Sequence, residues 1–200
     1  MSRPYSIRVA LALGSYIGGM SPSFAHSGTG LPGGVVAGFE HPLSGFDHLL
    51  AMVSVGLWGA FLGRPLIYAL PVIFPLMMVV GALLGMLGAP LPCVDLGVAA
   101  SVVLLGLCIA LAFRARAWVA CVIVALFALF HGYSHGVELP SAADPVGYSL
   151  GFVVATGLLH LAGIGIGLIT ESPSGVRVAR GLGAVAALTG LWFVYGALRP

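Results

Sequence analysis

The chain has 200 residues, of which 60% are hydrophobic and only 7% are charged, whereas a soluble domain typically carries about 25% charged residues. Its mean hydropathy of +1.10 excludes an intrinsically disordered chain, because disordered chains are poor in apolar residues. The formal net charge is +2, and the basic residues, all arginine, form no basic run, which excludes a nucleic-acid-binding surface. The composition therefore predicts an integral membrane protein.

The first 25 residues have the three regions of a secretory signal peptide. Arg3 and Arg8 precede an apolar stretch over residues 9–17, and small residues flank a cleavage site after Ala25. The alternative is an uncleaved first helix, but the apolar stretch is short for a membrane span. We therefore expect cleavage after Ala25 and a mature chain that begins at His26.

Six apolar runs follow, each close to the length of a transmembrane helix. The short connections between them carry Gly, Pro or Arg, and such connections make consecutive helices antiparallel neighbours. The sequence thus predicts an all-α fold in which residues 26–200 form a single domain, a bundle of six transmembrane helices. A glycine-rich stretch over residues 27–38 precedes them and is expected to be too flexible to hold structure alone. The predicted spans are Phe46–Leu62, Leu66–Leu87, Val94–Phe113, Trp118–Tyr133, Val146–Ile169 and Leu182–Leu198.

The arginines predict the orientation of the bundle. Five of them lie in the connections after the first, third and fifth spans, and the connections after the second and fourth spans have none. By the positive-inside rule, the arginine-bearing connections are cytoplasmic. A protein of the bacterial inner membrane would then have both mature termini in the periplasm, as a cleaved signal peptide also requires, and only Arg199 counts against this. The five arginines are Arg64, Arg114, Arg116, Arg177 and Arg180.

Small residues at a spacing of four predict where helices approach each other closely. We expect packing faces rather than functional sites at these positions. The pairs are Gly59/Gly63, Gly81/Gly85, Gly147/Gly151 and Gly163/Gly167.

Ionisable residues gather at the predicted outer side of the bundle. Asp47 and His48 lie about one turn inside the first span, where such side chains cost several kcal/mol unless they face the bundle interior and have a partner. His41 precedes His48 by seven residues, which is two helical turns if the helix begins early, near Pro42 or Ser44.

The fourth span ends in a second group of polar residues. His131, His135 and Glu138 fall at i, i+4 and i+7, on one stripe of a helix. A single histidine of this kind is often a hydrogen-bonded core residue, and for His160, near the membrane midplane, that reading stays open. The whole set is different, because imidazoles together with carboxylates suit a divalent ion such as Ni²⁺, Co²⁺ or Zn²⁺.

At these residues the sequence resembles the HupE/UreJ family of nickel and cobalt permeases. Residues 41–52, HPLSGFDHLLAM, match the family's HPxxGxDHLLAM signature, and residues 130–138, FHGYSHGVE, match its FHGxxHGxE signature. The resemblance covers the mature chain and implies uptake of Ni²⁺, or of Co²⁺, as a transported substrate, with no permanently bound cofactor. It implies that six residues handle the metal: His41, Asp47, His48, His131, His135 and Glu138.

The resemblance also implies a functional link to urease or hydrogenase accessory proteins, but the residues do not say which. Tyr133 and Ser134 are bulkier than the small residues expected within the second signature, so the choice between nickel and cobalt stays open. Whether Asp95, Phe74, His160 or the mature N-terminal His26 joins the metal path also stays open. An outer ring of carboxylates, to which Glu40 and Asp95 would belong, is expected to concentrate cations.

Two other classes of protein fit parts of this pattern. A membrane-embedded zinc hydrolase could use Asp47 and the His131/His135 pair to hold Zn²⁺ and activate water, but no separate residue stands out as a general base. A b-type haem carrier would need histidine pairs at matching depth on facing helices. The sequence therefore favours a metal permease, which is not an enzyme.

Overall fold

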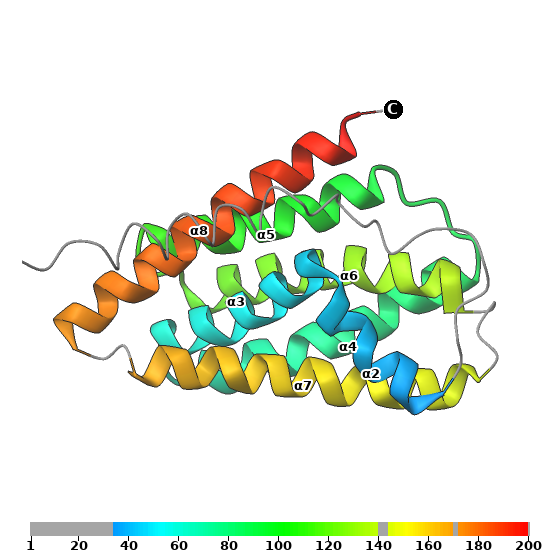
Figure 1. The fold of residues 1–200 in the computed structure, drawn as a ribbon, viewed down its shortest axis with the longest axis horizontal. Helices are drawn as coiled ribbons and strands as arrows, with labels where there is room; N and C mark the ends of the chain where they lie inside the picture. Colours follow the sequence, from blue (N-terminus) through cyan, green and yellow to red (C-terminus); the bar gives the residue numbers. More distant parts are fainter. Residues whose placement is uncertain (1–33, 140–143, 170–171, 200) are drawn as a thin grey trace, which may run out of the picture.

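The computed structural model describes residues 34–139, 144–169 and 172–199. Within these ranges the chain forms seven helices and no strand (Figure 1). The predicted signal peptide, its cleavage site at Ala25 and the mature terminus at His26 lie outside the described residues. The helices are α2 (Val35–Ser44), α3 (Phe46–Leu62), α4 (Leu66–Met86), α5 (Val94–Ala110), α6 (Ala117–Glu138), α7 (Pro145–Ile169) and α8 (Pro173–Ala197).

All six apolar runs are helical, and α3 to α8 follow them in order. Helix α6 continues five residues beyond the predicted end at Tyr133, so His135 and Glu138 are helical. Helix α8 begins at Pro173 rather than at Leu182. Its start is set by Ser172, whose side chain accepts a hydrogen bond from the backbone N–H of Gly175 at 3.1 Å, with proline at the first helical position.

Four helices, α4, α6, α7 and α8, are long and apolar enough to cross a membrane. Helices α2 and α3 pass the same test together, as a broken span or a re-entrant loop, and α5 is a shorter apolar helix of 17 residues. Large apolar side chains such as Leu76, Val79 and Leu83 face outward from α4. The chain is therefore a multi-pass membrane protein. Six spans require that α5 crosses the membrane and that α3, alone or together with α2, also crosses it.

The largest departure from the sequence prediction is the break between α2 and α3. Residues 35–38, expected to be unstructured alone, begin helix α2, because α2 packs on α7 through glycine contacts at Gly38 and Gly151. The chain is extended at Gly45, and the two helices meet at 83°. The prediction of a continuous helix that carries His41 and His48 on one stripe is therefore wrong.

Close backbone contacts join α4 to α6, α3 to α7 and α5 to α8 (Figure 1). A Cβ atom at Gly81 would overlap the carbonyl oxygen of Leu129 across the α4–α6 contact, and one at Gly163 would overlap that of Val53 across the α3–α7 contact. These packing faces are confirmed. The prediction is wrong for Gly63, which has φ +78 at the end of α3 and nothing near its missing Cβ.

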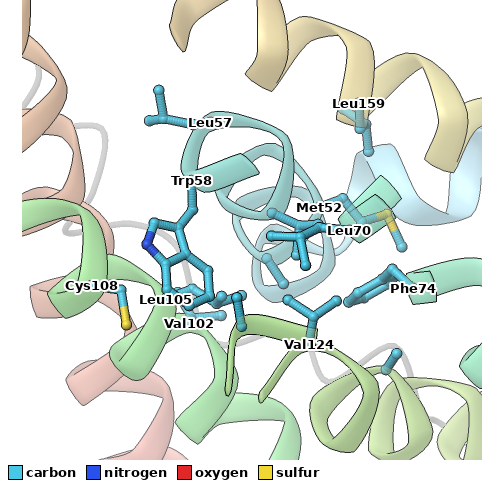
Figure 2. Packing of buried hydrophobic residues seen from close by; sticks show 14 of the residues in the cluster. Met52, Leu57, Trp58, Leu70, Phe74, Val102, Leu105, Cys108, Val124 and Leu159 are labelled. Carbon is cyan, nitrogen blue, oxygen red and sulfur yellow. The ribbon is translucent and has the colours of Figure 1, made fainter. Parts of the chain in front are cut away.

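The core lies between α3, α4, α5 and α6, where Met52, Leu70, Phe74 and Val124 meet (Figure 2). Each of these four side chains has 0% exposure. Trp58 closes the core toward the connection after α5, since its indole N–H donates to the carbonyl of Phe113 at 3.2 Å. The core thus fixes the inner parts of α3, α4 and α6, and the polar residues lie beyond it.

Candidate metal centre

Four histidines from three helices converge beyond the apolar core. The ring centroid of His135 on α6 lies 4.9 Å from that of His41 on α2 and 4.6 Å from that of His48 on α3. The ring of His131, one turn earlier on α6, lies 4.8 Å from that of His48. The break at Gly45 makes this possible, because it turns α2 so that His41 approaches the same residues as His48 does. Histidines of the two signatures, residues 41–52 and 130–138, thus lie together in the structure.

Glu138 joins this group from the last turn of α6. One donor atom each of His41, His135 and Glu138 lie within 4.8 Å of one another. Two ligands on opposite sides of a metal ion with bonds of about 2.1 Å are roughly 4.2 Å apart. The three residues are therefore spaced almost as closely as one ion requires.

Asp47 contacts the group through His48. Its Oδ1 accepts hydrogen bonds from Nδ1 of His48 and from the backbone N–H of His48, both at 2.8 Å. Because an ionised carboxylate only accepts, Nδ1 carries the proton and Nε2 carries the lone pair. Nε2 is buried and has no hydrogen-bond partner among the described residues. This is how metal-binding histidines are usually held, with a carboxylate on the second ring nitrogen.

Ser101 on α5 holds His131 in a similar way, and the sequence analysis missed it. The Ser101 hydroxyl donates its only proton to the carbonyl of Val98 at 2.6 Å, so it must accept from Nε2 of His131, which lies 2.9 Å away. The lone pair of His131 is therefore on Nδ1, which is buried and has no hydrogen-bond partner in the described part of the chain. A lone serine in an apolar run gives no sequence signal of this role.

Aromatic side chains enclose the cluster. The ring centroid of Phe152 on α7 lies 4.6 Å from that of His135, and the ring centroid of Tyr148 lies 5.7 Å from that of His41. Phe74 lies below the cluster, 5.7 Å from His131 on one side and 5.3 Å from His160 on the other, between ring centroids. The buried histidines and Phe74 thus form a continuous series of rings toward the interior of the bundle.

Other residues singled out in the sequence lie outside this group. Glu40 and Asp95 are exposed, and neither belongs to the clustered donor atoms found among the described residues. The hydroxyl of Tyr133 donates to the carbonyl of Ala89 at 2.7 Å, so its polar end is directed to the connection between α4 and α5.

The charges around the bundle favour a cation at the cluster. Asp47 and Glu138 contribute two carboxylates there. At the other end of the helices, the Arg180 guanidinium donates to the carbonyl of Ala110 at 2.7 Å, and Arg114 lies over the ring of Phe61, 5.3 Å from its centroid. Apart from Arg199, which follows α8, the described arginines thus lie at the end of the bundle opposite these two carboxylates, and the carboxylate end attracts cations.

Comparisons with known proteins agree with the two signatures. The family model described as HupE / UreJ protein matches residues 15–193. Protein HupE of Rhizobium leguminosarum bv. viciae is 42% identical over 176 residues, which cover 88% of this chain and 92% of that protein. No solved structure matches the chain.

Proposed function

Because the chain belongs to the HupE/UreJ family, we propose that it is a permease that takes up Ni²⁺, or Co²⁺, across the bacterial inner membrane. The observation that supports this best is the cluster of four imidazoles, three of them buried, with two partly exposed carboxylates. Two of its ring nitrogens, Nε2 of His48 and Nδ1 of His131, present lone pairs that no hydrogen bond uses within the described residues. A donor set of imidazole and carboxylate suits borderline divalent ions.

The carboxylates and the histidines have different tasks in this proposal. Glu138 attracts the hydrated ion and, with His41 and His135, replaces the first of its water molecules. Asp47 and Ser101 act through His48 and His131, whose lone pairs they fix. Ring nitrogens then replace further water molecules one at a time, so that no step strips the ion completely.

The orientation and processing are part of the same proposal. A signal peptide cleaved after Ala25, six spans and periplasmic termini would place the cluster at the periplasmic side and the arginine-bearing connections in the cytoplasm. The substrate would then enter from the periplasm at the cluster and be delivered to accessory proteins of urease or hydrogenase. The zinc-hydrolase alternative has no support from the family, and Asp47 is hydrogen-bonded to His48 rather than placed as a free base.

Initial rates of metal uptake test the proposal. Cells that express the protein should accumulate Ni²⁺ or Co²⁺ faster than cells with an empty vector, with Zn²⁺ as the comparison ion. His48→Ala should abolish most of this uptake at normal membrane abundance. Wild-type uptake in His48→Ala, or no uptake above the empty vector by the wild type, would contradict the proposal.

A further inference from the structure

His160 on α7 is a buried imidazole that the cluster does not use. Only 2% of it is exposed, and its Nε2 is buried without a hydrogen-bond partner among the described residues. A buried polar atom without a partner is rare in folded proteins and calls for a reason. The cost is larger within a membrane, where a polar group cannot find water.

The position of His160 relates it to the cluster. It lies eight residues after Phe152, the residue that contacts His135, which corresponds to about 12 Å along α7 toward the interior. The ring of Phe74 lies between His160 and His131, at 5.3 and 5.7 Å between centroids, and is fully buried. Phe74 therefore lies in contact both with His131 of the cluster and with His160.

A pocket lies between the cluster and the next turns of α7. It has a volume of about 100 Å³, is partly open, lies between α4, α6 and α7, and is lined by both His135 and Thr156. Thr156 lies one turn before His160, is 2% exposed, and its hydroxyl also has no hydrogen-bond partner among the described residues. Two polar side chains without hydrogen-bond partners in the described part of the chain thus lie one turn apart on α7, and the first of them lines the pocket.

The backbone holds His160 firmly in this place. A Cβ atom at Gly56 of α3 would overlap the carbonyl oxygen of His160, so the two helices touch through their backbones at this residue. The imidazole is therefore presented by a close contact between two helix backbones.

We propose that Nε2 of His160, with the hydroxyl of Thr156, forms a second, transient binding station for the divalent ion on the inner side of Phe74. The inference rests on the proposed function and adds a second binding site to the route of the ion. The station holds the ion through one imidazole, one hydroxyl and the water molecules that the ion retains. Because the cluster offers more ligands and two carboxylates, the ion binds more weakly at the station, which allows it to move on.

Two substitutions separate a metal ligand from a packing residue at this position. His160→Leu fills the space with an apolar side chain of similar size and removes the donor atom. His160→Cys supplies a different donor atom in a smaller side chain. Both are purified with the wild type and reconstituted into lipid vesicles that enclose a nickel-quenched dye. The maximal initial rate of Ni²⁺ entry and its half-saturating concentration are measured, together with Ni²⁺ binding in detergent by calorimetry.

We expect His160→Leu to lower the maximal rate about tenfold, with Ni²⁺ binding at the cluster unchanged, and His160→Cys to retain more of the rate than His160→Leu. A packing residue would give the opposite order, since leucine fills the space and cysteine does not. Wild-type rates in His160→Leu, equal or reversed loss in the two variants, or loss of Ni²⁺ binding in His160→Leu would each overturn the station. If the wild type itself admits no Ni²⁺, the proposed function fails, and the station with it.

Discussion

Ser101→Ala tests whether a hydroxyl on α5 controls the chemistry of a histidine on α6. The substitution removes the acceptor of the His131 Nε2–H hydrogen bond, at a residue with 0% exposure that water does not reach. A buried donor left without a partner costs about 1–3 kcal/mol. Nδ1 has no hydrogen-bond partner among the described residues either, so without Ser101 the ring loses its preference for Nε2–H, and Nδ1, the nitrogen that otherwise offers a lone pair, carries the proton part of the time.

The expected effect on transport follows from the same free energy. A cost of about 1–3 kcal/mol corresponds to a shift of roughly 5- to 150-fold in the balance between the two tautomers. This agrees with the loss of about 10- to 100-fold that is usual when a residue supporting a metal ligand is removed. We expect Ser101→Ala to lower Ni²⁺ uptake into this range, whereas Ser101→Thr, which keeps the hydroxyl, retains most of it.

Uptake is measured as an initial rate at low Ni²⁺ and is normalised to the amount of inserted protein. Nitrogen-15 spectra of the histidines report the tautomer directly, and the His131 signal should change from Nε2–H in the wild type to a mixture of Nε2–H and Nδ1–H in Ser101→Ala. If Ser101→Ala keeps both the wild-type rate and the wild-type tautomer, the role assigned to Ser101 is wrong.

Three further predictions concern the site, the packing and the topology. Asp47→Asn should lower Ni²⁺ uptake by about 10- to 100-fold at normal abundance, because an amide holds the His48 imidazole less well; Asp144→Asn, which changes an exposed carboxylate that caps α7, is the matched control, and equal rates in both would refute the role of Asp47. Gly132→Ala should destabilise the protein by about 1–3 kcal/mol, since its Cβ would overlap the carbonyl oxygen of Met78, whereas Gly165→Ala, with open space around it, should leave the thermal unfolding temperature of the solubilised protein unchanged. A reporter fused after residue 115 should be active in the cytoplasm and one after residue 142 in the periplasm, and the reverse pattern would invert the proposed direction of entry.

Helix positions and the members of the cluster could be predicted from the sequence, because apolar length and residue type determine them locally. The spacing of His131, His135 and Glu138 predicted one stripe, and α6 presents them so. The geometry of His41 could not be predicted, because the bend at Gly45 depends on α2 packing against α7 through Gly38. Periodicity within one segment carries no information about such a contact.

The role of Ser101 could not be predicted from the sequence for a different reason. It is a small polar residue in an apolar run, and its hydrogen bond reaches a histidine thirty positions away on another helix. The same holds for Phe74, whose place between His131 and His160 follows from the packing of α4 against α6 and not from its neighbours in the chain. Long-range partners of this kind become visible only when the helices are placed together.

In the second signature each histidine is followed by a glycine, and the structure shows what the histidines and the glycines each contact. His131 and His135 point toward the cluster, while Gly132 and Gly136 bring an adjacent side of α6 against the backbone of α4, at Met78 and Ala82. Transplanting the histidines alone onto a helix of another bundle would therefore not recreate the centre. To build this centre in another protein, α4 and α6 have to be transferred together, because the contact with α4 fixes the position of each imidazole along the bundle.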